Sequence, residues 1–96
     1  MPFPPQIPRE LTRENVEMLA PGTVGCYGLF TGDACIYIGK GDLRARLLAH
    51  LEGDNYCVRL HRPTHWVDVI TGYAHADAEE RQLVRELMPR CNERVS

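Results

Sequence analysis

Residues 25–41, GCYGLFTGDACIYIGKG, constrain the fold more than any other part of this chain. Two short segments, 23–30 and 34–39, are rich in β-branched and aromatic residues, and Thr-Gly-Asp separates them. This pattern predicts a β-hairpin. Each segment also places a tyrosine beside a glycine, and the two tyrosines, Tyr27 and Tyr37, stand ten residues apart.

The length of the hairpin loop decides which way the two tyrosines point. A three-residue loop, 31–33, makes Phe30 face Ala34 and puts Tyr27 opposite Tyr37 on one face of the sheet. A two-residue loop shifts the register by one and puts them on opposite faces. The residues alone leave both loops open.

The remaining elements follow from caps and breakers. Thr12 can cap a first helix, with Leu11 and Val16 as a hydrophobic staple, and Pro21-Gly22 would end it. Asp42 can cap a second helix that Gly53 ends. An irregular segment 54–64, a third strand 65–73 and a helix 78–88 complete the chain. The order predicts an α+β fold, a small three-stranded antiparallel sheet flanked by helices.

Composition limits the class of protein. The 96 residues suffice for one domain, and no apolar run is as long as a membrane span, so we expect a cytoplasmic protein with no membrane contact. We expect a loosely ordered proline-rich leader with the first helix in residues 1–21 and the functional domain in 22–96. A net charge of −2 argues against strong nonspecific attraction to nucleic acid over the whole surface.

The four cysteines show no C-x-x-C spacing and have no histidines at zinc-finger distances, which favours free, buried thiols. They are Cys26, Cys35, Cys57 and Cys91.

Two polar residues stand out on the second predicted helix. Leu43, Leu47 and Leu51 repeat every four residues and should face the sheet. Arg46 and His50 are also four apart, so both should reach the rim of the sheet. An arginine offers a planar fork for a phosphate and a histidine can carry a proton, although each alone is also typical of a solvated helix face.

Glu80 occupies an unusual position on the last predicted helix. It falls on the buried stripe of that helix, whose other members are Leu83, Val84 and Leu87. A carboxylate there needs a partner. Either it forms a capping box with Asp77, or it binds a metal.

In order and spacing these residues resemble the GIY-YIG nuclease family. Gly25-Cys26-Tyr27 stands at the GIY element and Tyr37-Ile38-Gly39 at the YIG element. The segment LRARLLAH resembles the helix that carries the arginine of the family, here Arg46, with His50 four residues on. The segment from Glu80 to Asn92 resembles the closing segment of the family, and the likeness spans about residues 22–95.

The resemblance implies a metal-dependent endonuclease that uses one divalent cation, Mg²⁺ or Mn²⁺, held by Glu80. It also favours the three-residue loop. Tyr27 would take a proton from the attacking water, which requires a nearby cation to favour the ionised phenol. Lys40 is the first candidate for that cation and Arg46 the second.

The other positions receive roles from the same resemblance. Arg46 would hold a non-bridging phosphate oxygen, Tyr37 and His50 would orient water or phosphate, and Asn92 would fix the local backbone or the glutamate. The general base stays open among Tyr27, His50 and Lys40.

The implied partner is DNA, with branched, damaged or single-stranded forms as candidates. No added DNA-binding domain is visible, so we also expect a possible protein partner that supplies specificity, and a nuclease subunit that needs such a partner is one alternative. A non-catalytic nucleic-acid-binding or protein-interaction module with the same fold is another. The basic and aromatic residues of 54–64 fit a DNA contact and a solvated loop equally well.

Overall fold

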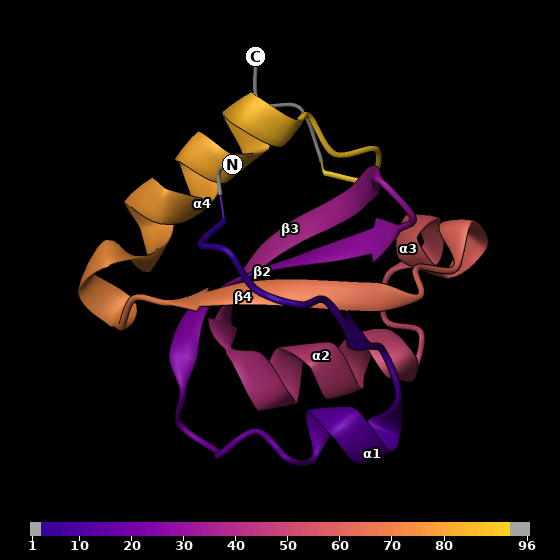
Figure 1. The fold of residues 1–96 in the computed structure, drawn as a ribbon, viewed down its shortest axis with the longest axis horizontal. Coiled ribbons are helices and arrows are strands. Elements are labelled where there is room, and N and C mark those ends of the chain that lie inside the picture. Colours follow the sequence, from indigo (N-terminus) through magenta and orange to yellow (C-terminus); the bar gives the residue numbers. More distant parts are fainter. Residues whose placement is uncertain (1–2, 93–96) are drawn as a thin grey trace.

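The computed structural model describes residues 3–92 as a four-stranded antiparallel sheet with helices on both faces (Figure 1). The strands, in the order β1-β4-β2-β3, are β1 Arg9–Glu10, β2 Val24–Thr31, β3 Ala34–Asp42 and β4 His65–Ile70. The helices are α1 Arg13–Val16, α2 Leu43–Leu51, α3 Tyr56–His61 and α4 Tyr73–Leu87. The predicted α+β class is confirmed. The sheet has a fourth strand because two residues of the leader pair with β4.

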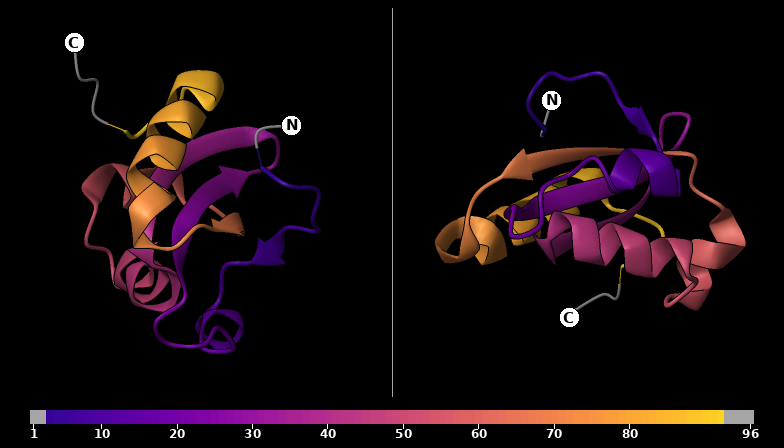
Figure 2. Two further views of the ribbon diagram at one scale, coloured as in Figure 1. Left: turned by 90° about the vertical axis from the view of Figure 1, so that its left-hand side faces the viewer. Right: turned by 90° about the horizontal axis from the view of Figure 1, so that it is seen from below.

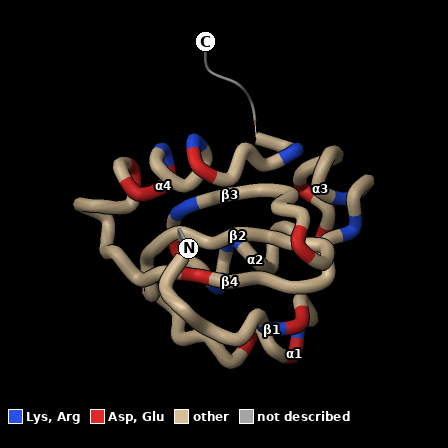
Figure 3. The backbone as a smooth tube through the Cα atoms, turned by 45° about the horizontal axis from the view of Figure 1, so that its top comes forward, with Lys and Arg blue, Asp and Glu red and all other residues tan. Residues whose placement is uncertain are grey.

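The sheet lies between two layers of helix. Helix α4 covers one face, whereas α2 covers the other with α1 beside it (Figures 1 and 2). Side chains alternate along β2, so Cys26 joins the core under α4 while Tyr27 and Leu29 join the core under α2. Acidic and basic residues are mixed along α4 rather than separated (Figure 3).

The hairpin between β2 and β3 differs from the prediction in its loop. Thr31 pairs with Ala34, so only Gly32 and Asp33 form the turn. Gly32 has φ +59°, a conformation that favours glycine. The three-residue loop is therefore wrong.

A β-bulge corrects the register that this short turn would impose. The pairing shifts by one between Leu29 and Phe30, because Phe30 pairs with Cys35 while Leu29 pairs with Tyr37. Ile36 is the extra residue. The bulge returns Tyr37 to the face that carries Tyr27, so the shared face is confirmed although the two tyrosines are not directly opposite.

Helix α2 begins and ends where the sequence predicts. The side chain of Asp42 accepts a hydrogen bond from the backbone NH of Ala45, and Gly53, at φ +86°, follows the helix. Leu43 and Leu47 are buried as expected, but Leu51 is 36% exposed. His50 is the buried residue of the last turn instead.

Two helices were mispredicted. Residues 54–64 contain α3, which begins after Asn55, whose side chain accepts from the backbone NH of Val58. Helix α4 begins at Tyr73 rather than near residue 78, and β4 ends at Ile70 rather than at Tyr73. No side chain caps α4, since Gly72 precedes it. Its beginning therefore carries no signal in the sequence.

The leader is packed rather than loose over the described residues. Phe3 is only 3% exposed and belongs to the core under α4. Gln6 hydrogen-bonds the backbone of Asp68 twice, at 2.7 and 3.0 Å. Thr12 caps α1 by accepting from the NH of Asn15, but this helix ends at Val16. The division of the chain at residue 22 stays a prediction.

The cysteines divide into two pairs. Cys26 and Cys35 are buried and free, as predicted, and burial raises their thiol pKa values to about 11 and about 12. Cys57 and Cys91 form a disulfide, so their assignment as free thiols is wrong. Sequence spacing gave no sign of this pair because the fold brings together positions 34 residues apart. Among the helices of residues 3–92, none has the length and apolar character needed to cross a membrane.

Candidate active site

Three aromatic rings form a compact cluster on the α2 side of the sheet. Tyr27, from the middle of β2, is fully buried, and its hydroxyl lies 2.7 Å from Nε2 of His50 on α2. The Tyr37 ring is 5.0 Å from that of His50 and 6.2 Å from that of Tyr27, measured between centroids. The fold thus joins three of the predicted site residues.

Two glycines leave room for this cluster and for the sheet beneath it. Gly39 pairs with Tyr27, and a Cβ at position 39 would lie 2.2 Å from the Tyr27 hydroxyl oxygen. A Cβ at Gly25 would lie 2.0 Å from the carbonyl oxygen of Val69 on β4. A side chain at either position would clash, which accounts for the glycine in each tyrosine-glycine segment.

His50 is held between a phenol and a carboxylate. Its Nε2 faces Tyr27, while Nδ1 lies 3.4 Å from Oδ1 of Asp54. Nδ1 is buried and makes no hydrogen bond with the described residues, because the alignment with Asp54 is poor. Burial lowers the pKa of His50 below 6.5; Asp54 opposes this effect and Arg46 adds to it. The imidazole is therefore neutral at pH 7.

Asp54 is a site residue that sequence reasoning missed. It follows His50 by four residues, a spacing at which side chains meet along a helix. That signal was present, but Gly53 ends the helix between them. Asp54 also lies 3.7 Å from Nη2 of Arg46.

Arg46 is the cation that acts on the tyrosines. Burial raises the pKa of Tyr27, and the positive charge of Arg46 lowers it by less. Burial also raises the pKa of Tyr37 against the opposing effect of Arg46. Both phenols are therefore protonated at neutral pH. The expectation that Lys40 favours an ionised Tyr27 is wrong.

Lys40 instead points to the other face of the sheet, toward α4. It forms an ion pair with Asp77, and its Nζ lies 3.3 Å from Oε1 of Glu80. Asp77 also pairs with Arg81 at 3.2 Å. Because α4 begins at Tyr73, Asp77 and Glu80 lie inside the helix, and the predicted capping box is wrong.

The outer edge of β3 joins the two halves of the site. This strand is the last of the sheet, and it carries Tyr37 on the α2 side and Lys40 on the α4 side. The charge of Glu80 contributes to the raised pKa of Tyr37, so the carboxylate from α4 acts on the aromatic cluster. All seven predicted residues lie on or against the β2-β3 hairpin.

Asn92 holds the backbone of the strand that carries the site. Its Oδ1 accepts from the NH of Ile38, and its Nδ2 donates to the carbonyl of Ile38, both at 2.8 Å. Ile38 stands between Tyr37 and Gly39. Asn92 therefore positions β3, in agreement with the predicted backbone role, and within residues 3–92 its side chain makes no hydrogen bond to Glu80.

Glu80 fits a hard divalent cation. Its side chain is 23% exposed, and its partner is a flexible lysine rather than a fixed donor. Mg²⁺ is typically held by one or two carboxylates, with waters and substrate phosphates completing its shell.

A hollow of about 680 Å³, lined by Phe3, Pro8 and Thr64 among others, contains none of the predicted site residues. The site lies along the outer edge of β3, where the side chains of Lys40 and Arg46 are partly exposed.

Sheet, helices and paired tyrosines together define the class: the chain has the GIY-YIG fold. Among solved structures it is similar to the GIY-YIG N-terminal endonuclease domain of UvrC from Thermotoga maritima. A tyrosine-to-phenylalanine variant of that domain, bound to its catalytic divalent cation, is 26% identical, with a TM-score of 0.72 over 85% of this chain and 94% of that one. The magnesium-bound domain is 24% identical, with a TM-score of 0.70 over 85% of this chain and all of the other. No family model matches the chain, and no curated protein does either.

Proposed function

We propose that this protein is an endonuclease that hydrolyses DNA phosphodiester bonds with a single divalent cation, Mg²⁺ or Mn²⁺, at Glu80. The observation that carries the proposal is the arrangement at the β3 edge. There the hydrogen-bonded pair Tyr27 and His50 lies beside a half-exposed Arg46, and the partly buried carboxylate of Glu80 lies on the α4 side of the same strand edge. The similar UvrC domain binds a catalytic divalent cation, which supports the choice of metal.

Hydrolysis of a phosphodiester needs an activated water, a held phosphate and a stabilised leaving oxygen. A cation at Glu80 supplies Lewis acidity to the phosphoryl oxygen and the leaving 3′-oxygen. Arg46 binds a non-bridging oxygen, since its side chain is 41% exposed and its guanidinium lies 3.7 Å from Asp54.

The proton of the attacking water leaves through a relay. Tyr27 is protonated at neutral pH, so it cannot act as a free phenolate. Instead Tyr27 accepts the proton of the water while its own proton passes over 2.7 Å to Nε2 of neutral His50. The imidazolium so formed faces Asp54. The phenol stays neutral throughout, and His50 is the final base.

Substrate binding must open this relay. Tyr27 has no exposed surface in the free protein, and its hydroxyl is hydrogen-bonded to His50. Water can therefore reach this hydroxyl only after side chains around Tyr27 move when the substrate binds.

Three further residues support the reaction. Tyr37 orients the water or the phosphate from the partly exposed edge of the cluster. Lys40 pairs with Glu80 and with Asp77 in the free protein, and it would be the cation nearest to a phosphate bound beside Glu80. Asn92 positions the strand between them.

DNA is the proposed partner, with branched, damaged or single-stranded forms as candidates and DNA repair as the candidate process. Helix α3 begins two residues after Asp54 and presents Tyr56, 70% exposed, with the guanidinium of Arg59 5.8 Å from its ring centroid. An aromatic face beside a cation suits a base and a phosphate. This helix is the proposed contact for the substrate.

The test is cleavage of a labelled panel comprising supercoiled plasmid, single strand, flap and branched junction, with Mg²⁺ or with EDTA. Glu80→Ala and Arg46→Ala are each expected to lower the cleavage rate about 100-fold or more, because each removes charge stabilisation of the transition state. EDTA is expected to abolish cleavage. Glu86→Ala and Arg85→Ala, exposed positions on α4, are the matched controls and keep wild-type rates.

Other outcomes identify the alternatives. A folded wild type that binds one substrate but cuts none overturns the nuclease in favour of a binding module. Cleavage that appears only when a partner protein is added identifies a subunit. Equal rates in Glu80→Ala and wild type would exclude Glu80 as the metal ligand.

A further inference from the structure

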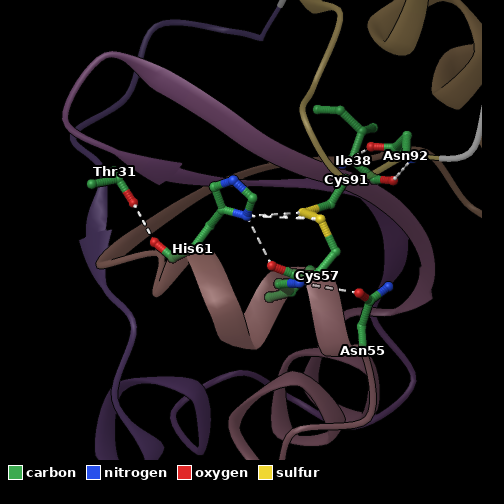
Figure 4. Close-up of a disulfide and its surroundings, with 8 residues drawn as sticks. Thr31, Ile38, Asn55, Cys57, His61, Cys91 and Asn92 are labelled. Carbon is green, nitrogen blue, oxygen red and sulfur yellow. Dashed lines mark hydrogen bonds between the residues drawn. A yellow bond between two sulfur atoms is a disulfide. The ribbon is translucent and has the colours of Figure 1, made fainter.

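Three metal-ligating side chains meet at the end of β3 that is away from Lys40 and Glu80. Cys57 and His61 lie four residues apart on one face of α3, and Cys91 comes from the segment after α4 (Figure 4). Their ligand atoms all lie within 4.8 Å of one another. The proposed nuclease chemistry uses none of them.

The histidine already has the geometry of a tetrahedral metal ligand. Nδ1 of His61 lies 3.7 Å from Sγ of Cys57 and 3.6 Å from Sγ of Cys91. A tetrahedral Zn²⁺ with bonds of about 2.3 Å to sulfur and about 2.0 Å to nitrogen puts these atoms roughly 3.6 Å apart. Only the two sulfurs must separate, from a covalent bond to roughly 3.8 Å by the same geometry.

Each ligand is held by contacts that do not depend on the disulfide. The backbone NH of Cys91 donates to the carbonyl of Ile36 at 2.8 Å, and Asn92 holds Ile38. Helix α3 is fixed by its Asn55 cap and by buried Val58. The thiols would therefore stay close together after reduction.

We propose that the reduced protein binds one thiophilic divalent cation, of which Zn²⁺ is the type, through Cys57, Cys91 and His61, with water in the fourth position. A thiol or phosphine reductant supplies two electrons to the disulfide, and two protons complete the thiols. Metal binding then releases one proton from each thiol. His61 gives up its 3.0 Å contact with the carbonyl of Cys57 and donates its Nδ1 lone pair to the metal.

This site differs in chemistry from the one proposed at Glu80. Two thiolates and an imidazole select a borderline-soft cation, whereas a carboxylate with waters suits Mg²⁺. Oxidation to the disulfide and metal binding exclude each other, because both use the same sulfurs. The proposal does not depend on nuclease activity.

The probe is Co²⁺ added to the whole protein after reduction with a phosphine that is then removed without air. The reduced wild type is expected to bind one equivalent with a thiolate-to-cobalt charge-transfer band and the visible bands of a tetrahedral complex. Zn²⁺ should displace the colour. A carboxylate-bound Co²⁺ gives no such charge-transfer band, so binding at Glu80 does not interfere.

Variants separate a three-ligand site from a simple dithiol. Cys57→Ser and Cys91→Ser are expected to lose the charge-transfer band that indicates paired thiolates. His61→Ala, at an exposed position, should fold normally and bind at least about 10-fold more weakly. His75→Ala, exposed on α4, is the control and keeps wild-type affinity.

Zn²⁺ should also raise the melting temperature of the reduced wild type. The proposal is overturned if the reduced, folded wild type shows no thiolate band. It is equally overturned if His61→Ala binds as tightly as wild type, or if circular dichroism shows that reduction alone unfolds the chain and Zn²⁺ does not restore it.

Discussion

The phenol of Tyr27 is buried from solvent, and its hydroxyl has one hydrogen-bond partner among the described residues, His50. Its hydroxyl meets Nε2 of His50, whose other nitrogen already has no hydrogen-bond partner within residues 3–92. The pair therefore carries both stability and, in the proposed relay, proton transfer.

Tyr27→Phe keeps the ring and removes only the hydroxyl. It should lower the free energy of unfolding by about 1–3 kcal/mol, because Nε2 of His50 stays buried without a partner. It should also slow cleavage at least about 100-fold, because the relay loses its first step. Urea denaturation and single-turnover cleavage measure the two effects. Tyr56→Phe, on the exposed face of α3, should change stability by less than about 0.5 kcal/mol.

His50 makes stability depend on pH in a predictable direction. Burial puts its folded pKa below the unfolded value of about 6.5, so the unfolded chain binds the proton more readily. The contribution of His50 to stability is complete above about pH 6.5 and is lost as the pH falls through the folded pKa. Urea denaturation between pH 7.5 and 5 should show this loss in wild type. A wild-type slope matched by His50→Gln would contradict the assignment.

At the scale of single residues, the sequence identified which side chains form the candidate site but not the side chains that pair with them. Tyr27, Tyr37, Arg46 and His50 were predicted on motif order, and the fold joins them. The partner of Lys40 was mispredicted, since strand alternation directs it toward α4. Such pairings depend on which helix covers which face, and no local pattern encodes that.

Among the elements, the β2-β3 hairpin combines a two-residue turn with a β-bulge. The two-residue turn shifts the register of β3 by one residue, and the bulge at Ile36 shifts it back. Tyr37 therefore lies on the α2 face. Counting residues back from the turn cannot reveal this, because a bulge leaves no fixed residue type in the sequence. The shared face of the tyrosines was predicted correctly with the wrong loop.

Gly39→Ala tests the close contact inside this hairpin. The new methyl group would lie 2.2 Å from the Tyr27 hydroxyl, so the ring must shift away from His50. We expect a loss of about 1–3 kcal/mol in unfolding free energy together with loss of cleavage. Gly22→Ala is the control, because position 22 has φ +86° but open space around it. It should cost stability through strain and leave cleavage intact.

On the scale of the whole molecule, the leader belongs to the core. Phe3 packs under α4 with Cys26 and Leu83, and Gln6 bonds the backbone of β4. Proline-rich composition predicted a loose segment because it measures local propensity and not long-range contact. The Cys57–Cys91 pair escaped prediction for the same reason.

Phe3→Ala should therefore destabilise the protein by about 3–5 kcal/mol, the usual cost of emptying a buried aromatic site. Ile7→Ala, in the same leader but 87% exposed, should change it by less than about 0.5 kcal/mol. Thermal and urea denaturation of the two variants give the comparison. A Phe3→Ala protein as stable as wild type would mean that the leader does not pack in solution.

The segment that carries Asn92 has one more consequence. β3 is the outermost strand, and an outermost strand normally offers its free backbone groups to any other chain that can pair with them. Here Arg90 and Cys91 donate to the carbonyls of Cys35 and Ile36, and Asn92 satisfies both backbone groups of Ile38. The edge is closed from Cys35 to Ile38, so a second copy of this protein could extend the sheet there only by first displacing residues 90–92.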